Sequence, residues 1–496
     1  MKELTALLPE ELDFFKCVHY ASAANPFGRE RVLREAQIAG IPPDSPKEIR
    51  MLKVCQAVKH CLAQAEKRGR INLGSFKGED QYFLRSALLF HYFHLFRKEI
   101  DTLITRQLDN AEESLDAHFA PEALALLRGW GFGIDESRRC IALAYQLRRA
   151  YYFIFRHLVG RSSCMQQLRR DLWQNVFTHD ILMYDQYLWN RMENFSTLLF
   201  GETGTGKGTA ALAMGRSGYI PFDEKENKFT HNFVNTFTTL NISQFPETII
   251  ESELFGHVRG AFTGAVKDHK GVFSQCSPNG SILLDEIGEL STHVQIKLLN
   301  VLQDRVYSPV GSDEKHRFHG RIIAATNRSI REIREKKIFR DDFYYRLCSD
   351  IITVPPLHKR IAQDPEELPD LLAHTVTRIV GQPSPEIVSR VLEYIEGSLT
   401  LSYPWPGNVR ELEQCVRRVV LRNAYEYETD EALEPASKAD ALTRQIQDGR
   451  LSAQDLLIHY CTRLYEKHGT YEAVARIAGL DRRTVKKYID SRDQVH

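Results

Sequence analysis

The first 157 residues place apolar side chains three and four positions apart. This spacing is clearest in residues 46–68, 79–108 and 135–158. It gathers the apolar side chains on one face of a helix, and prolines and glycines separate the helical segments. Strands do not alternate with these helices, which argues against a doubly wound receiver domain. We therefore predict an all-α domain over residues 1–157.

From residue 158 the pattern changes to short apolar runs between helical segments. The runs are TLLF (197–200), SILLDE (281–286) and RIIAATN (321–327). Runs of this kind are typical of buried parallel strands that are connected by helices. The pattern therefore predicts an α/β domain over residues 158–365.

Helical periodicity returns towards the C-terminus. We predict a helical region at 366–427, a polar linker at 428–447 and a compact basic helical unit at 448–496. The predicted fold class is therefore multidomain, with an all-α N-terminal domain, an α/β domain followed by helices, and an all-α C-terminal unit. The 496 residues are enough for three or four domains of about 100–200 residues each.

Composition and charge limit the binding sites, the thiol chemistry and the cellular location to be expected. Lys and Arg together number 65, as do Asp and Glu, so a nucleic-acid site has to be local. The nine cysteines are scattered without a CxxC pair, which favours reduced thiols. The N-terminus lacks a signal-peptide layout, and no run approaches the roughly 20 apolar residues of a membrane span. We expect a soluble, cytoplasmic protein that makes no membrane contact.

A glycine-rich loop between a predicted strand and a helix indicates a phosphate site. Strand TLLF leads into GETGTGKGT and then into the helix-forming run AALAMG, which is the context of a Walker A loop. Backbone N–H groups of such a loop hold phosphate oxygens, and its lysine reaches the β- and γ-phosphates. The predicted ATP-binding residues of the loop are Gly201, Glu202, Thr203, Gly204, Thr205, Gly206, Lys207, Gly208 and Thr209.

The position after the lysine departs from the general pattern. Gly208 stands where a Ser or Thr would bind magnesium, and Thr209 comes one place later. Taken alone, the loop leaves a simple glycine turn as the alternative. The second motif, SILLDE, ends a buried strand with two carboxylates at the sheet edge where ligands bind. Asp285 is placed to hold Mg²⁺ and Glu286 to polarise water, and the alternative is a solvated strand end.

The hexapeptide GAFTGA holds an aromatic side chain between two glycines. It comprises Gly260, Ala261, Phe262, Thr263, Gly264 and Ala265. Glycine allows the tight backbone bends of an exposed loop, and an apolar tip on such a loop indicates a partner surface. The alternative is an ordinary turn whose phenylalanine folds back into a core.

In these motifs the chain resembles the AAA+ domain of bacterial enhancer-binding proteins, the activators of sigma-54 RNA polymerase. The resemblance covers roughly residues 158–427. Its motifs run in order through LVGRSSCMQQL, GETGTGK, ESELFGHVRGAFTGA, GSILLDEIGEL, RIIAATN, FRDDFYYRL and YPWPGNVREL. It implies a P-loop ATPase core with a helical lid, ATP and Mg²⁺ as ligands, and contact of the Phe262–Thr263 loop with sigma-54.

The resemblance also assigns roles to single residues. Asn241 corresponds to an asparagine that hydrogen-bonds the catalytic glutamate, here Glu286. The other assigned residues are the first sensor (Thr326, Asn327), the arginine fingers (Arg340, Arg346) and the second sensor (Arg410). Fingers that reach a neighbouring subunit's site imply a homo-oligomeric ring, in this family usually a hexamer that is dimeric when inactive. A surface cation is the alternative for each finger.

Three features differ from the family pattern. The family commonly carries Glu after the Walker A lysine, and Gly208 supplies no carboxylate. Two segments look like insertions, LMYDQYLWNRMENF (182–195) and YIPFDEKENKFTHNFVNTF (219–237). They are predicted to be either surface elaborations or contacts to the N-terminal domain.

Residues 469–490 have the layout of a helix-turn-helix. Ala475 permits close helix packing, Gly479 permits the turn and Val485 supplies the core. The unit resembles the Fis-like domain of the same family, which binds double-stranded DNA at an upstream activator site, and its preceding helix at 452–468 is expected to form a dimer contact. The predicted DNA-binding residues are Arg482, Arg483, Thr484, Lys486 and Lys487. A helical hairpin with a solvated basic face is the alternative.

Together these observations predict a sigma-54-dependent transcriptional activator that uses ATP hydrolysis to remodel the sigma-54 polymerase. Its rivals are a DNA-binding repressor in which nucleotide only promotes assembly, and an AAA+ remodeller of another protein. The N-terminal domain shows no metal or ligand pattern; His91 and His94 lie three apart on one helical run, where packing is the expected role. By its position this domain is expected to regulate the ATPase.

Overall fold

A computed structural model describes all residues except 1–5, 112–113, 399–402, 423–451 and 491–496. The chain divides into two compact units, Met1–Ala424 and Tyr425–His496, which are described separately. Among the described residues, no helix combines the length and apolar character that a membrane crossing requires. The predicted linker at 428–447 lies outside the described residues.

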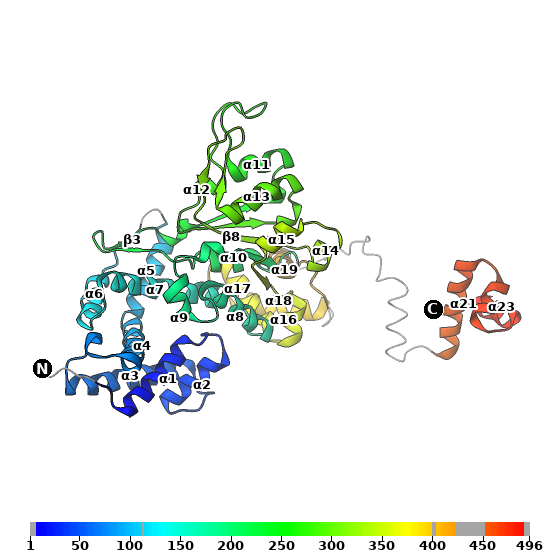
Figure 1. Ribbon diagram of the computed structural model, residues 1–496. Coiled ribbons are helices and arrows are strands. Elements are labelled where there is room, and N and C mark those ends of the chain that lie inside the picture. The colour runs from blue at the N-terminus through cyan, green and yellow to red at the C-terminus, as the bar shows by residue number, and fades with distance from the viewer. Residues whose placement is uncertain (1–5, 112–113, 399–402, 423–451, 491–496) are drawn as a thin grey trace. The chain divides into compact units, whose positions relative to one another are not determined.

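The N-terminal part of the first unit is helical, as predicted (Figure 1). Its helices are α1 (Pro9–Ala23), α2 (Arg29–Ala39), α3 (Lys47–Arg68), α4 (Gly78–Leu95), α5 (Arg97–Asp109), α6 (Ala120–Gly129) and α7 (Ile134–Tyr152). The apolar run 79–108 forms two helices because the backbone leaves helical geometry at Phe96, whose side chain is buried between them. Helix α7 continues into a π-helical turn, η2 (Phe153–His157).

A five-stranded parallel sheet forms the centre of the first unit, with strand order β4-β5-β8-β1-β9. Its strands are β1 (Thr197–Phe200), β4 (Phe237–Asn241), β5 (Ser281–Asp285), β8 (Arg321–Thr326) and β9 (Asp350–Thr353). The three strands predicted from apolar runs are the inner ones, and every residue of β8 is buried. Strands β4 and β9 escape such a prediction because they are edge strands with partly exposed, more polar residues.

Each face of the sheet packs against a different set of helices. The connecting helices are α8 (Ser163–Phe177), α10 (Lys207–Gly215), α11 (Glu247–Phe255), α12 (Val272–Gln275), α13 (Thr292–Asp304), α14 (Ile330–Glu335) and α15 (Asp341–Leu347). Alternate strand residues point to opposite faces, so Leu198 and Leu199 lie in different cores. The core that holds Leu199 contains α8 and α10 and continues without interruption into the N-terminal helices.

The two predicted insertions contact the N-terminal helices. Residues 219–237 form a small hairpin of β2 (Phe222–Asp223) and β3 (Lys228–Phe229), followed by the 3₁₀ turn η5 (Phe233–Thr236). Glu224 accepts from Arg128 on α6 at 2.7 Å and from Arg138 on α7 at 2.8 Å. In the other insertion, Asp185 pairs with Arg85 on α4. Of the two expectations for these segments, contact with the N-terminal domain is therefore correct.

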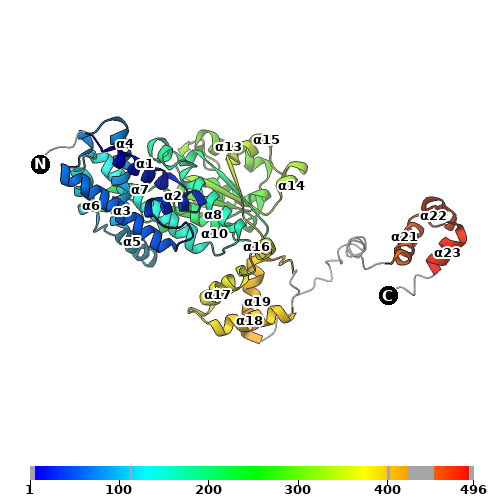
Figure 2. The ribbon, with the colours of Figure 1, turned by 90° about the horizontal axis from the view of Figure 1, so that it is seen from below.

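The helices after the sheet form a compact group (Figure 2). They are α16 (Leu357–Gln363), α17 (Glu367–Val380), α18 (Pro385–Ser398) and α19 (Asn408–Arg422). The second unit contains α21 (Ala453–His468), α22 (Tyr471–Ala478) and α23 (Arg482–Asp490). Its small core is built on one buried residue from each helix, Cys461, Val474 and Val485.

Candidate functional site

Parallel strand order brings the predicted polar residues to one edge of the sheet. Asn241, at the end of β4, is in register with Asp285 at the end of β5. Thr326, at the end of β8, is in register with Phe200 at the end of β1. Because all five strands run in the same direction, their carboxyl ends form a single edge. Three motifs that are far apart in the chain therefore meet where the glycine loop begins.

The glycine loop joins β1 to α10 through two residues with positive φ. Gly204 has φ of 78° and Gly206 has φ of 101°, a backbone region that side chains rarely adopt. Lys207 begins α10, and its Nζ donates to the carbonyl oxygens of Gly201 at 2.8 Å and Glu202 at 3.1 Å. The lysine tip therefore lies inside the loop.

Charges from two other motifs influence Lys207. Burial lowers the pKa of its ammonium group below the usual value, and the positive charge of Arg410 acts in the same direction. The carboxylates of Glu286 and Asp285 act in the opposite direction. The predicted second sensor, the strand-end carboxylates and the loop lysine therefore lie within electrostatic range of one another.

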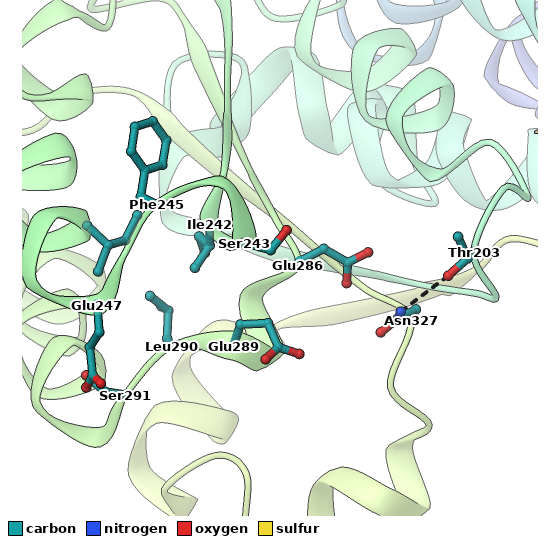
Figure 3. A pocket seen from close by; sticks show the side chains of 11 residues that line it. Thr203, Ile242, Ser243, Phe245, Glu247, Glu286, Glu289, Leu290, Ser291 and Asn327 are labelled. Carbon is teal, nitrogen blue, oxygen red and sulfur yellow. Dashed lines mark hydrogen bonds between the residues drawn. The ribbon is translucent and has the colours of Figure 1, made fainter.

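A cavity of about 640 Å³ opens beside this loop (Figure 3). Figure 3 shows Glu286 on the same side of the cavity as Thr203 and Asn327. The Asn327 amide donates to the Thr203 hydroxyl at 3.3 Å, which links the predicted first sensor to the glycine loop. Glu286 has a left-handed backbone, with φ of 54° and ψ of 46°, and its N–H donates to Asp285 at 3.0 Å. A non-glycine residue held in this region is strained, as is common at functional sites.

Asn241 does not hydrogen-bond Glu286, contrary to the role implied by the resemblance. Its side-chain oxygen accepts from the Ser243 N–H at 3.0 Å and from the Ser243 hydroxyl at 2.7 Å. Within the described part of the chain, no hydrogen bond joins Asn241 to Glu286. The local turn after β4 satisfies Asn241, because a short amide side chain readily bonds the backbone two residues further on.

Asn408, which the sequence analysis did not single out, joins the glycine loop to the helices after the sheet. Its side-chain NH₂ donates to the Thr203 carbonyl at 3.0 Å and to the Glu202 carboxylate at 3.1 Å, and its oxygen accepts from the Leu357 N–H at 2.7 Å. Asn408 is fully buried and has φ of 52°. The signal was the Pro-Gly-Asn turn before the α19 motif, since Asn tolerates this conformation.

Two glycines of the loop should respond oppositely to alanine. At Gly204 an added Cβ would lie 2.2 Å from the Gly407 carbonyl oxygen, whereas at Gly208 it would meet nothing within 4 Å. We expect Gly204→Ala to lower the free energy of unfolding by about 2 kcal/mol or more through strain and overpacking. Gly208→Ala is expected to raise it by about 0.5 kcal/mol, since alanine favours helix. Thermal unfolding of both variants checks this prediction, and equal midpoints would contradict it.

The two predicted arginine fingers lie away from the cavity. Arg340 pairs with Asp342 through two hydrogen bonds of 3.0 and 2.9 Å on the exposed start of α15. Arg346 donates from Nε to the carbonyl oxygen of Leu302 at 3.0 Å. Neither side chain lines the cavity of its own chain.

The GAFTGA loop lies between α11 and α12 and projects beyond the sheet beside the segment that joins β6 (Val306–Tyr307) to β7 (His316–Arg317) (Figure 1). Its ends are closed by a hydrogen bond of 2.8 Å from the Gly260 N–H to the Ala265 carbonyl. The Phe262 side chain is 44% exposed, and one edge rests on the His257 ring at a centroid distance of 4.9 Å. Phe262 is therefore not folded into a core.

In the second unit, the predicted DNA-binding residues lie on α23. Arg483, Lys486 and Lys487 are exposed, and Thr484 is half-buried. Arg482 is exposed but paired with Glu472 on α22 at 2.9 Å. Gly479 provides the left-handed turn between the two helices, with φ of 65°.

The chain matches two known domain families. Residues 183–353 match the Sigma-54 interaction domain, and residues 364–448 match the AAA+ ATPase lid domain.

Two curated proteins and a solved structure are similar to part of this chain. The Nif-specific regulatory protein of Azotobacter vinelandii is 43% identical over 225 residues, which are 45% of this chain and 39% of that protein. The DNA-binding transcriptional regulator NtrC of Rhizobium meliloti (strain 1021) is 36% identical over 299 residues, 60% of this chain and 51% of that protein. The chain thus spans between 39% and 51% of the length of these two relatives. A crystal structure of NtrX from Brucella abortus in complex with ATP is 22% identical, with a TM-score of 0.40 over 75% of this chain and 80% of that chain.

The matches and the fold agree on the central part of the molecule. The Sigma-54 interaction domain covers the glycine loop, the GAFTGA loop and the strand-end carboxylates, and the lid domain covers α19, the helix that Asn408 begins and joins to the glycine loop. Residues 183–353 therefore belong to the Sigma-54 interaction domain family, and residues 364–448 belong to the AAA+ ATPase lid domain family.

Proposed function

We propose that this protein activates sigma-54-dependent transcription by hydrolysing ATP and moving its GAFTGA loop against the sigma factor. The observation that supports the proposal is the meeting of Glu286, the glycine loop and the first sensor at one cavity, in a domain that also projects the GAFTGA loop. We assign regulation to 1–157, the ATPase core to 158–365, its lid to 366–427, a linker to 428–447 and DNA binding to 448–496.

The chemistry follows from the residues of the site. Backbone N–H groups of residues 201–209 and the Lys207 ammonium group would hold the phosphates of ATP. Asp285 would hold Mg²⁺, which when bound neutralises phosphate charge. Glu286 would accept a proton from the water that attacks the γ-phosphorus, so that ADP leaves as phosphate forms. For the lysine to contact the phosphates, its bonds to the Gly201 and Glu202 carbonyl oxygens must be exchanged.

The position of Arg340 and Arg346 supports a ring. Both lie outside the cavity of their own chain, as a residue that completes a neighbour's site must. An arginine supplied by a neighbour increases NTP hydrolysis by about 10³–10⁵-fold in related enzymes. We propose that the active form is a homo-oligomeric ring, with a hexamer as the expected size.

We propose that the second unit anchors the ring on double-stranded DNA upstream of the promoter. The three-helix arrangement and the exposed Arg483, Lys486 and Lys487 on α23 support this role. Phosphate contacts by such side chains give affinity and orientation, and base contacts give sequence preference.

The direct test of the proposal is Thr263→Ala. Thr263 is exposed on the projecting loop, so its loss should leave folding, ATP hydrolysis and DNA binding intact while sigma-54-dependent transcription is abolished. Transcription in a reconstituted sigma-54 system measures the effect. Thr102→Ala, the same chemical change on exposed α5, serves as the matched control. Normal transcription by the Thr263 variant would refute the mechanism.

Gly208 is the observation that favours a rival function. Position 208 carries neither a hydroxyl nor a carboxylate. In the rival function the protein is a DNA-binding repressor, and bound nucleotide promotes its assembly without being hydrolysed. Measured phosphate release from the purified protein separates the two functions. Activity that is independent of sigma-54 would indicate a remodeller of another protein.

A further inference from the structure

The N-terminal helices enclose a second cavity of about 1100 Å³. Residues of α1 to α5, α7 and α8 line it, together with residues of the turn η2 and of the segment 181–185. Sites for small organic molecules typically measure about 300–1,000 Å³, so a metabolite and some water would fit. The proposed ATP, sigma and DNA sites do not include it.

The lining carries more positive than negative charge. Nine lysine and arginine side chains and four carboxylates line the cavity. Arg31 and Arg50 share Glu35, and Arg148 forms two hydrogen bonds of 2.7 Å with Asp101. Arg97, in contrast, has no carboxylate partner among the residues that the structure describes. The excess charge favours an anion as ligand.

Arg31, Arg97 and Arg148 line the same cavity as His94. Burial, assisted by the charges of Arg31, Arg97 and Arg148, lowers the pKa of His94 to about 3. The imidazole is therefore neutral, and its Nδ1 is buried without a hydrogen-bond partner in the described part of the chain. A buried polar atom without a partner is uncommon in proteins and is satisfied when a ligand supplies the missing group. Arg97 offers a planar guanidinium beside it, which suits a carboxylate, sulfonate or phosphate.

Aromatic rings lie next to these charges. The Arg148 guanidinium lies 5.3 Å from the centre of the Tyr151 ring. Tyr151 stacks on Phe27 at 5.7 Å, and Phe27 in turn meets the edge of Trp173 at 5.9 Å. Tyr151 and Trp173 line the cavity, so an apolar, ring-containing body can pack beside the cationic group.

We propose that this cavity binds a small organic anion with an aromatic body, whose acidic group contacts Arg97 beside His94 and whose rings pack against Tyr151 and Trp173. The proposal goes beyond the proposed function, because it assigns a ligand site to a region that carries none of the ATPase motifs.

Helix α7 connects this cavity to the ATPase domain. Arg148 faces the cavity, whereas the neighbouring Arg149 donates to the carbonyl oxygens of Arg216 at 2.6 Å and Gly218 at 2.7 Å. Gln146, one turn earlier, donates to the Ser217 carbonyl at 2.9 Å. These carbonyls directly follow α10, the helix that begins at Lys207. A ligand that favours one position of α7 would therefore also favour one position of the α10 end.

Binding of a fluorescent aromatic anion to the full-length protein tests the proposal. The probe is 1-anilinonaphthalene-8-sulfonate, and N-phenyl-1-naphthylamine provides nearly the same rings without the acidic group. We expect saturable sulfonate binding that Arg97→Gln weakens about ten-fold or more, the usual effect of losing a hydrogen bond to a charged group. Binding of the neutral amine should be unchanged.

Arg106→Gln is the matched control, because Arg106 is an exposed arginine of the same helix outside the cavity. Circular dichroism confirms that both variants are folded. The proposal is overturned if the native protein shows no saturable sulfonate binding, or if the Arg97 and Arg106 variants bind the sulfonate equally. It is also overturned if Arg97→Gln weakens the neutral amine as much as the sulfonate.

Discussion

Glu286→Gln is expected to lower the rate of ATP hydrolysis by about 10²–10⁴-fold, the usual contribution of a general base, without loss of ATP binding. Glutamine keeps the size of glutamate but cannot accept a proton from water. The loop residues that would hold the phosphates are unchanged by this substitution. Steady-state phosphate release measures the rate, and titration calorimetry measures ATP affinity.

Glu289→Gln is the matched control for this experiment. Glu289 lines the same cavity, but its exposed carboxylate is paired with Arg328 at 2.6 Å. Because exposed ion pairs contribute little, we expect this variant to retain most of its activity. Equal loss in both variants would show that cavity charge, and not a base at Glu286, controls the rate. An active Glu286 variant would remove the residue from the mechanism.

Arg149→Ala is expected to lower the free energy of unfolding of the first unit by about 3–5 kcal/mol. The Arg149 side chain is fully buried, and its guanidinium lies 4.4 Å from the Tyr145 ring centre. Alanine leaves a cavity and removes the donors that satisfy the carbonyl oxygens of Arg216 and Gly218. Urea unfolding measures the loss, and hydrogen exchange locates it.

Arg138→Ala is the control for the same helix and the same contact region. The Arg138 side chain, which pairs with Glu224, is 40% exposed. Its removal is therefore expected to lower the free energy of unfolding by about 0–1 kcal/mol. In Arg149→Ala, faster exchange of amides near residues 207–218 would show that α7 supports the end of α10. Exchange that is unchanged there, or a stability loss no greater than in Arg138→Ala, would contradict this role.

The shared core also affects how the proposed control by the N-terminal domain can be studied. Leu199 and Ala210, which belong to the sigma-54 interaction domain, lie in the same apolar cluster as the N-terminal helices. Deletion of residues 1–157 would therefore expose apolar surface, in addition to any effect on the proposed control. The rate of ATP hydrolysis by Arg149→Ala tests the coupling between α7 and the end of α10, and this single substitution exposes less apolar surface than the deletion.

Much of the proposed nucleotide site could be predicted because its chemistry is local. A glycine loop between a strand and a helix, and two carboxylates at the end of an apolar strand, need only their immediate neighbours in sequence. Parallel pairing then brings Asn241 and Asp285 to one edge. In this structure the Asn241 side chain bonds Ser243 and not Glu286, since the turn after β4 gives it a nearer partner.

Asn408 shows why the rest of the site could not be predicted. Its amide contacts Glu202 and Thr203, which lie 206 and 205 residues earlier in the chain. The Pro-Gly-Asn turn indicated a bend, but only the docking of α19 on the loop decides which carbonyls that amide meets. The same holds for the GAFTGA loop, where the sequence indicated an exposed tip and the fold placed His257 under Phe262.

By itself, the sequence determined the order of helical and α/β regions, the two ATPase motifs, the projecting loop and the helix-turn-helix pattern. Each depends on side-chain periodicity or on the backbone needs of a few adjacent residues. Tertiary structure alone decided that Arg149 donates to the carbonyl oxygens that follow α10, that the 219–237 insertion contacts the N-terminal helices, and that Arg97 and His94 share a cavity. These roles depend on which segments, distant in the sequence, pack together. Burial removes water from a charged group or a carbonyl oxygen, so the packing decides whether that group has a hydrogen-bond partner.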